Sequence, residues 1–378
     1  MEKEDICLVQ GNEACVKGAV RAGCRFFAGY PITPASEIAE LMAREMPACD
    51  GDFVQMEDEI GSIAAVVGAA WGGRKSLTAT SGPGFSLMQE GLGYAVETET
   101  PCVIINVMRG GPSTGQPTVS SQQDVMQARF GAHGDYEAIV LCPASVQDCY
   151  ELTVKAFNLA ERFRTPVVVL SDEIVGHTRE ILTIPKDMDV TERRPPSQSP
   201  ENYLPYQADA DGLLDGMPAF GQGYRMLVDG QLHDEAGNRR GADTRISGAL
   251  MRRLCEKVTG HAGELEDVKT ESTEDAKTLV LAYGSVARSA LSAVRRAREE
   301  GIRAGFFQPR LLWPFPEAAL ARCLSGVERI LVPEMNMGKV VREVERLCPD
   351  LEVVSLARVG GELHTPEEIL THLATPDA

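Results

Sequence analysis

The chain has 378 residues and a formal net charge of -18 at pH 7. This length predicts two or three domains with enough apolar core to fold without disulfide bonds. The negative charge argues against a nucleic acid partner, and no apolar run approaches the ~20 residues that a membrane-spanning helix needs.

Up to about residue 185, apolar strands alternate with amphipathic helices. The clearest helix is expected over 145–164, where apolar side chains recur at helical spacing. Such alternation is typical of a parallel sheet with helices on both faces, and ligands of such folds bind beyond the carboxyl ends of the strands. The expected strands lie at 6–9, 26–28, 53–55, 77–80, 103–108, 138–141 and 166–170.

The next part of the chain has a different composition. A proline-rich stretch at 195–200 is followed by a Gly- and Asp-rich stretch at 209–243, which favours short hairpins over helices. Residues 264–275 are rich in Glu and Asp and predict a solvated connection. We therefore interpret 188–275 as a Pro/Gly-rich linker and insertion.

Strand–helix alternation resumes after this insertion. It predicts a second, smaller α/β domain at 276–378, after a first domain at 1–187. In the second domain we expect strands at 278–282, 303–307, 330–332 and 353–356, and helices at 289–299, 316–324, 340–347 and 366–373.

A turn with the sequence Tyr-Pro-Ile-Thr-Pro, at 30–34, connects the strand at 26–28 to a helix. Two prolines restrict the backbone around Thr33, and Pro34 suits the first position of a helix. Thr33 is therefore predicted to be the N-cap, where free N–H groups and the helix dipole favour a carboxylate or an oxyanion. Capping of its own helix is the simpler role for this hydroxyl.

Glu59 is expected at the start of a helix that is rich in glycine and alanine. An acid in the first turn is ordinary, because it complements the helix dipole. Small residues, however, let this helix pack very closely against a neighbour. A carboxyl group at the mouth of such a helix can hold or share a proton.

Arg109 ends the strong strand at 103–108 and is followed by a Gly-rich polar loop that reaches Thr118. Arginine pairs bidentately with carboxylates and keeps its charge when partly buried. The loop glycines allow the backbone to approach a small ligand. A bridge from Arg109 to a neighbouring acid is the structural alternative.

Ser81-Gly82-Pro83-Gly84 follows the strand at 77–80 and is a partial dinucleotide fingerprint. Leu87 stands where the third glycine should be, so a nicotinamide cofactor site is disfavoured. An independent NADP-dependent dehydrogenase remains an alternative, and it predicts that the isolated chain binds NADP.

The chain has ten cysteines, but no two of them are spaced C-x-x-C. Zinc and iron–sulfur sites need clustered thiolates, so no metal site is predicted in this chain. Reduced, mostly structural cysteines indicate a reducing compartment, and we expect a cytoplasmic protein.

Several stretches together carry a family resemblance. They are Tyr-Pro-Ile-Thr-Pro at 30–34, Glu-Asp-Glu-Ile-Gly-Ser-Ile at 57–63, Thr-Ser-Gly-Pro-Gly-Phe-Ser-Leu-Met at 80–88, Arg-Gly-Gly-Pro-Ser-Thr-Gly-Gln-Pro-Thr at 109–118, His-Gly-Asp at 133–135, Thr-Pro-Val-Val-Val-Leu-Ser-Asp-Glu at 165–173 and Asn-Met-Gly-Lys-Val at 336–340. On these, the chain resembles the alpha subunits of 2-oxoacid:ferredoxin oxidoreductases over nearly its whole length. The loop after Arg109 and the stretch 124–129 most resemble the 2-oxoglutarate branch. The pattern departs at Gln122-Gln123-Asp124, where a glycine is expected before the aspartate.

This resemblance implies an α/β fold, with a parallel-sheet pyrimidine-binding domain for thiamine diphosphate followed by a transketolase C-terminal-like α/β domain. It implies a beta subunit that holds the diphosphate, Mg²⁺ and a [4Fe-4S] cluster. Gamma and ferredoxin-like delta subunits are further candidate partners. Coenzyme A is implied as co-substrate and ferredoxin as electron acceptor.

By resemblance, Glu59 is the catalytic residue and contacts the aminopyrimidine of the cofactor. Tyr30, Pro31 and Gly84 are implied as cofactor-binding residues beside it. Such a carboxyl group must exchange a proton in a dry cleft.

The substrate residues are implied in the same way. Thr33 and Arg109 would hold the 2-oxoacid carboxylate, and Thr118 a second carboxylate. The implied reaction converts 2-oxoglutarate and coenzyme A to succinyl-CoA and carbon dioxide, with two electrons passed to ferredoxin. The same machinery acting on branched-chain or aryl 2-oxoacids, and a non-catalytic scaffold subunit, are the alternatives.

Overall fold

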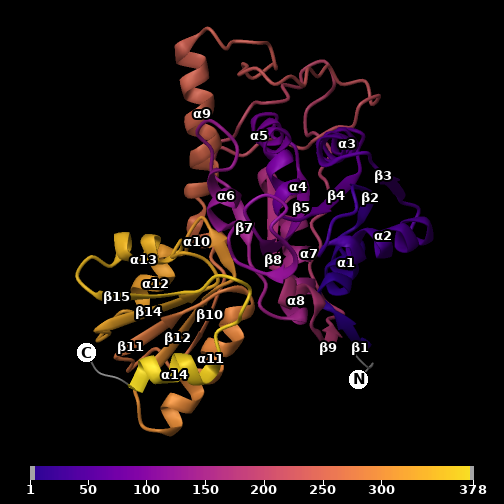
Figure 1. Cartoon of the computed structure of the whole chain (residues 1–378). Coiled ribbons are helices and arrows are strands. Elements are labelled where there is room, and N and C mark those ends of the chain that lie inside the picture. The colour runs from indigo at the N-terminus through magenta and orange to yellow at the C-terminus, as the bar shows by residue number, and fades with distance from the viewer. Residues whose placement is uncertain (1–4, 375–378) are drawn as a thin grey trace.

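The protein, seen here as a computed structural model, is described over residues 5–374 (Figure 1). Its first domain contains an eight-stranded sheet. In sheet order the strands are β13 (Leu311–Trp313), β7 (Ile139–Leu141), β8 (Pro166–Asp172), β5 (Cys102–Gly110), β4 (Lys75–Thr80), β2 (Cys24–Gly29) and β3 (Asp52–Gln55), with β6 (Gln116–Ser120) beside β5. The strands from β7 to β3 are parallel, whereas β13 and β6 pair antiparallel. The predicted α/β class with a parallel sheet is confirmed.

Helices cover both faces of this sheet (Figure 1). One face carries α1 (Gly11–Arg21), α2 (Ser36–Ala48) and α7 (Val146–Phe163). The other carries α3 (Glu59–Trp71), α4 (Gly82–Leu87), α5 (Gln89–Glu97) and α6 (Val125–Phe130). The central strand β5 alternates between the two cores, with Val103 and Ile105 in one and Ile104 and Met108 in the other. Within residues 5–374 no helix is both long and apolar enough to cross a bilayer.

One strand expected in this sheet lies apart from it. β1 (Asp5–Gln10), predicted at 6–9, pairs with β9 (Arg179–Ile184) in a separate antiparallel ribbon. β9 follows the short helix α8 (Glu173–His177). Leu8 and Ile181 lie opposite each other in the ribbon and are both exposed. The apolar residues that predicted a strand of the main sheet therefore lie partly on the surface of this ribbon.

The second domain has a five-stranded sheet. In sheet order its strands are β10 (Val268–Glu271), β12 (Ala304–Pro309), β11 (Thr278–Leu281), β14 (Arg329–Glu334) and β15 (Glu352–Ala357). Its helices are α11 (Gly284–Glu299), α12 (Glu317–Arg322), α13 (Val341–Leu347) and α14 (Pro366–Ala374). The division of the chain at 187 and 275 stays a prediction, and its outermost residues, 1–4 and 375–378, lie outside the described part.

Neither β10 nor β13 was predicted from the sequence. Instead of a solvated connection at 264–275, the structure has α10 (Ala262–Leu265) and β10, which pairs antiparallel with β12. The central residues of β10 are exposed, so its backbone pairing leaves no apolar pattern in the sequence. β13 comes from the second domain but extends the sheet of the first.

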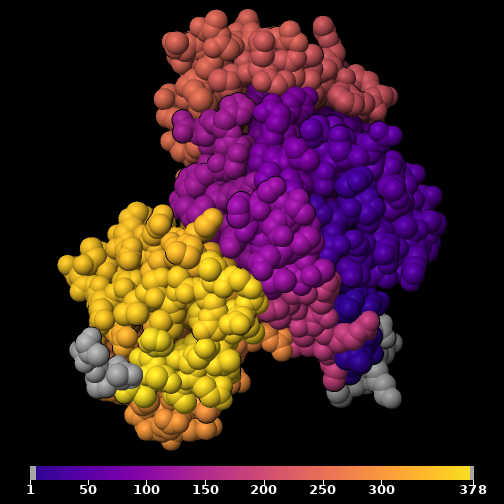
Figure 2. All heavy atoms as spheres, viewed as in Figure 1, coloured from indigo at the N-terminus to yellow at the C-terminus, as the bar shows by residue number. Residues whose placement is uncertain are grey.

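Most of the insertion, residues 188–275, covers the end of the first domain that lies away from the second (Figure 2), whereas its last strand, β10, belongs to the sheet of the second domain. The hairpins expected at 209–243 reduce to two single antiparallel bridges, between Ala208 and Leu214 and between His233 and Arg239. The long helix α9 (Thr244–Thr259), which we did not predict, runs from the insertion towards the second domain (Figure 1).

A buried charge cluster fastens α9 to the first domain. Glu99, in the loop after α5, is fully buried and accepts from Lys257 Nζ at 2.7 Å. Arg253 Nη1 donates to the same carboxylate at 3.0 Å. Burial alone would raise the pKa of Glu99, but the charges of Lys257 and Arg253 overcome this effect and lower the pKa to about 2.

We expect Glu99→Gln to lower the free energy of unfolding by about 3–5 kcal/mol, because it leaves Lys257 and Arg253 buried without a counter-charge. The wild-type Glu99 pKa is depressed, so its stabilising effect is present above the unfolded pKa of 4.5 and is lost as pH falls towards about 2. Urea unfolding at pH 7 and at acidic pH measures both effects. Glu90→Gln, at an exposed acid, is the control, and an equal loss in the two variants would contradict the prediction.

Candidate functional site

The Tyr-Pro-Ile-Thr-Pro stretch forms a turn at the carboxyl end of β2. Helix α2 begins only after Ala35, which is its N-cap residue. The amide of Ala35 donates to the carbonyl of Ile32 at 2.8 Å, and this closes a turn before the helix starts. The prediction of Thr33 as N-cap, with Pro34 as first helical residue, is therefore wrong.

Two side chains from other elements fix this turn. Arg109 Nη1 donates to the carbonyl of Thr33 at 2.6 Å. Asn12 Nδ2, at the start of α1, donates to the carbonyl of Pro34 at 2.9 Å and is nearly fully buried. The structure thus brings Thr33 and Arg109 together, through the carbonyl of Thr33 rather than its hydroxyl. No pattern in the sequence singled out Asn12.

Arg109 is the residue before last of β5 and is 6% exposed. Its Nη2 donates to the carbonyl of Thr114 at 3.0 Å, while its buried Nε has no partner within residues 5–374. Burial lowers the pKa of Arg109, and the nearby carboxylates of Asp124 and Glu59 act to raise it. Within the described residues Arg109 forms no ion pair. Its guanidinium is held by backbone carbonyls, and the alternative role, a salt bridge to a neighbouring acid, is not observed there.

Glu59 is the first residue of α3, and its carboxyl group lies against α4. Asp58 caps the helix by accepting from the Gly61 amide at 2.7 Å, which leaves the buried side chain of Glu59 free of that task. A Cβ at Gly84 would overlap both Glu59 Oε1 and Thr80 Oγ1. Because Gly84 has no side chain, α4 can lie close to Glu59 at the start of α3 and to Thr80 at the end of β4.

This meeting point holds several polar atoms without partners. Thr80 Oγ1 and Ser81 Oγ are buried and have no hydrogen-bond partner within residues 5–374. The carboxylate of Glu59 likewise makes no hydrogen bond to the described part of the chain. Buried polar groups are usually paired, so a place where two buried hydroxyls lack partners beside a carboxylate is suited to a polar ligand.

Three other predicted site residues, Tyr30, Pro31 and Thr118, are more exposed than Glu59 and Arg109. Tyr30, 41% exposed, and Pro31 follow β2 at the same edge of the sheet. Thr118 is exposed on β6, two residues before Ser120, which is paired with Arg109. The structure thus gathers Glu59, Gly84 and Arg109 at the carboxyl edge of the sheet and leaves Tyr30, Pro31 and Thr118 open to solvent.

Gln122, in the stretch Gln122-Gln123-Asp124 that departs from the family pattern, is a contact between the two domains. Gln122 is fully buried, and its amide and side chain exchange hydrogen bonds with the backbone of Met335 at 3.0 and 3.1 Å. Its Nε2 donates to the carbonyl of Tyr283 at 2.8 Å, and its own carbonyl accepts from Asn336 Nδ2 at 2.8 Å.

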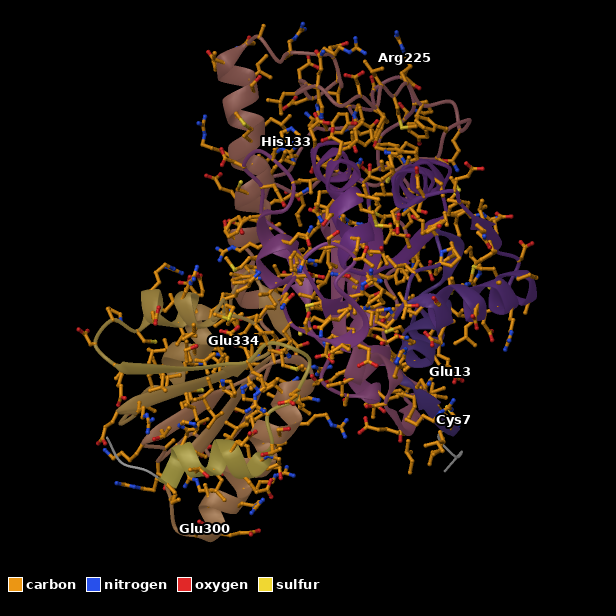
Figure 3. The ribbon with its side chains drawn as sticks, viewed as in Figure 1. Cys7, Glu13, His133, Arg225, Glu300 and Glu334 are labelled. Carbon is orange, nitrogen blue, oxygen red and sulfur yellow. The ribbon has the colours of Figure 1, made fainter. Side chains whose placement is uncertain are left out.

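Asp172 and Lys339 add contacts between the domains, and the buried acid Glu334 holds Tyr283 on the second domain's side. Asp172, at the end of β8, accepts from the Ser285 amide at 2.8 Å. Glu334 lies on the side of the second domain that faces the first (Figure 3), and it accepts from Tyr283 Oη at 2.7 Å. Lys339 Nζ reaches the carbonyl of Gln123 at 2.7 Å. The second domain therefore packs at the edge of the first sheet that carries the site.

Comparisons with known proteins agree with this geometry. The family model described as pyruvate flavodoxin/ferredoxin oxidoreductase, thiamine diphosphate-binding, matches residues 17–251. The chain belongs to this family. The model of pyruvate:ferredoxin oxidoreductase core domain II matches residues 276–369.

Relatives over the full length are named as subunits of such enzymes. The chain is 54% identical to 2-oxoglutarate synthase subunit KorA of Methanothermobacter thermautotrophicus, over 96% of both chains. It is 34% identical to ketoisovalerate oxidoreductase subunit VorB of the same organism, again over 96% of both chains.

Among solved structures, the chain is similar to 2-oxoglutarate:ferredoxin oxidoreductase from Magnetococcus marinus, whose structure has 2-oxoglutarate, coenzyme A and succinyl-CoA bound. The TM-score is 0.92 at 35% identity. The match covers 99% of this chain but spans only 65% of that one. The family, the fold and the oxidoreductase class expected from the sequence are thus confirmed.

Proposed function

We propose that this chain is the alpha subunit of an enzyme that oxidatively decarboxylates 2-oxoglutarate. With coenzyme A the products are succinyl-CoA and carbon dioxide, and two electrons pass to ferredoxin. The observation that carries the proposal is the buried side chain of Glu59, which makes no hydrogen bond to residues 5–374 and lies beside Gly84 within electrostatic reach of Arg109. It gives one site both an acid–base group and a cation for a substrate carboxylate.

The residues present fit the ring of thiamine diphosphate. Thr80 and Ser81 offer buried hydroxyls that lack hydrogen-bond partners within residues 5–374, and a Cβ at Gly84 would fill the space between the side chains of Thr80 and Glu59. When bound, thiamine diphosphate supplies the nucleophilic carbon and the electron sink for decarboxylation. Glu59 would hold and move the proton of the aminopyrimidine, with Gly84, Tyr30 and Pro31 lining the ring.

Arg109 and Thr33 would bind the carboxylate that all 2-oxoacids share. The partnerless Nε of Arg109 and its retained charge support this role. The turn carbonyl of Thr33 holds the guanidinium in place, which leaves the Thr33 hydroxyl for the substrate. Thr118, on the exposed loop after Arg109, would bind the second carboxylate of 2-oxoglutarate.

The relatives favour 2-oxoglutarate over branched-chain 2-oxoacids. Four curated relatives named as 2-oxoglutarate synthase subunits are between 50% and 54% identical to this chain, whereas those named for ketoisovalerate are 34% identical. Because both groups match over almost the same length, the difference lies within the shared domains.

The site needs further chains. We propose a beta subunit that supplies the diphosphate site, Mg²⁺ and a [4Fe-4S] cluster, with gamma and ferredoxin-like delta subunits as additional partners and ferredoxin as electron acceptor. The names of the relatives as subunits support this assembly. We also propose a cytoplasmic location, which the ten free thiols suit.

Co-expression of the chain with its candidate partners tests the proposal. We expect coenzyme A-dependent dye reduction with 2-oxoglutarate, and much less with 3-methyl-2-oxobutanoate or phenylpyruvate. Preference for one of the latter acids would assign the branched-chain or aryl reaction instead. No reduction with any 2-oxoacid by an assembled, cofactor-loaded complex would favour a scaffold subunit.

A further inference from the structure

The loop after Arg109 is held at its two ends and, between them, by the bond from Arg109 Nη2 to the carbonyl of Thr114. Residues 112–118 are all exposed. At the start of the loop, the Gly111 amide donates to Gln123 Oε1 at 2.8 Å. At its end, Ser121 Oγ donates to the carbonyl of Arg109 at 2.6 Å. We call residues 112–120 the substrate loop, since it carries Thr118.

The second domain contacts this loop through a glycine. Gly361 lies in the connection between β15 and α14 and has a φ of +95°. A Cβ at Gly361 would overlap Val119 Cγ1 and would lie 3.6 Å from the carbonyl oxygen of Ser120. The connection can therefore pack against β6 only because residue 361 has no side chain.

A comparison with Gly360 shows which of two possible reasons, backbone conformation or close packing, requires a glycine at position 361. Gly360 has almost the same φ, +94°, but a Cβ at Gly360 would meet nothing within 4 Å. Both residues need a backbone conformation that favours glycine. Only Gly361 also needs the missing Cβ for a close approach.

The two sides of this contact differ in how firmly they are held. The connection is braced at Arg358, whose amide donates to the carbonyl of Glu334 at 3.0 Å and whose Nη1 donates to the carbonyl of Leu363 at 3.1 Å. His364 Nε2 also lies 2.8 Å from the carbonyl of Leu356. The loop side is an edge strand that, among the strands of residues 5–374, pairs with β5 alone, and valine has little freedom at χ1. An added side chain at residue 361 should therefore displace β6 rather than the connection.

We propose that Gly361 is a positioning residue, which lets the second domain set the place of Val119 and hence of Thr118 over the substrate site. Thr118 is adjacent to Val119, while the cation for the shared carboxylate, Arg109, belongs to the rigid central strand. The contact thus governs recognition of the second carboxylate of a dicarboxylic 2-oxoacid. This inference rests on the proposed function.

The test compares Gly361→Ala with Gly360→Ala in the assembled complex. We expect Gly361→Ala to raise the KM for 2-oxoglutarate on the order of tenfold to a hundredfold, because a displaced binding group loses its geometry. The KM for 2-oxobutyrate, which lacks the second carboxylate, and kcat should stay near their wild-type values. Gly360→Ala imposes the same backbone strain without the overlap and should leave both KM values unchanged.

A second substitution tests the contact itself. Val119→Ala removes the overlapped Cγ1, so the Gly361→Ala/Val119→Ala double variant should recover most of the lost affinity for 2-oxoglutarate. Equal effects of Gly360→Ala and Gly361→Ala, an equal rise in KM for both acids, or no recovery in the double variant would each overturn the proposal.

Amide hydrogen exchange separates this proposal from the proposed function. Residues 112–120 should exchange faster in Gly361→Ala than in Gly360→Ala, whatever substrate the enzyme uses. A wild-type complex that is inactive with 2-oxoglutarate but shows this difference would contradict the assigned substrate and keep the positioning role. Identical exchange in the two variants would overturn the positioning role even in an active enzyme.

Discussion

Glu59→Gln is expected to lower turnover of the assembled complex by about 10²- to 10⁴-fold, the range for loss of a positioned acid–base group. Glutamine keeps the size of the buried side chain but cannot exchange a proton. Because Asp58 rather than Glu59 caps α3, helix formation and assembly should be unaffected. Steady-state dye reduction with 2-oxoglutarate measures the loss, and size-exclusion chromatography with thermal unfolding checks assembly.

The chain offers a close control for this change. Glu57 is exposed and lies two residues before Glu59, the first residue of α3, so Glu57→Gln makes the same chemical change outside the site. It should leave turnover near the wild-type value. Retention of turnover in Glu59→Gln would contradict the catalytic role of Glu59 and would favour the scaffold alternative.

The meeting of Arg109, Thr33 and Glu59 could be predicted because each follows or ends a parallel strand. Strand ends at one edge of a sheet lie close together whatever their separation in the chain. The detail of the contact could not be predicted in this way. Whether Thr33 offers its hydroxyl or its carbonyl to Arg109 depends on a turn that closes at Ala35, and two prolines are compatible with either arrangement.

The glycines after β4 show a similar limit. Their spacing alone suggested, weakly, a dinucleotide fingerprint, because the sequence cannot show what each glycine faces. In the structure, Gly84 faces the carboxyl group of Glu59 and the hydroxyl of Thr80. The requirement for glycine at position 84 is therefore steric, because a Cβ there would overlap these two side chains.

Contacts between distant parts of the chain were missed altogether. Glu99 meets Arg253 and Lys257 across 154 and 158 positions, and no local pattern announces such a pair. Gln122 was named only as part of a stretch that departs from a family pattern, although it makes hydrogen bonds to three residues of the second domain. The roles of such residues depend on how the domains pack. Hydrophobic periodicity and turn chemistry describe only local structure, so they give no sign of these contacts.

Arg109→Lys should raise the KM for every 2-oxoacid by about tenfold to a hundredfold, the equivalent of losing one hydrogen bond with a charged group, about 1.5–3 kcal/mol. Lysine keeps the charge but is a single ammonium group, so it cannot hold the carbonyls of Thr33 and Thr114 and also offer a fork to a carboxylate. Steady-state kinetics with 2-oxoglutarate and 2-oxobutyrate measures the change.

A second buried arginine provides the control. Arg164 precedes β8, at the opposite edge of the same sheet, and its Nη2 also lacks a partner within residues 5–374. Arg164→Lys should lower the melting temperature but leave KM unchanged. Comparing 2-oxoglutarate with 2-oxobutyrate distinguishes the two ends of the substrate. Loss of Arg109 should weaken the binding of both acids, since both carry the first carboxylate. Displacement of Thr118 should weaken the binding of 2-oxoglutarate only. A KM rise restricted to 2-oxoglutarate in Arg109→Lys would contradict the assignment, because Arg109 would then bind the second carboxylate.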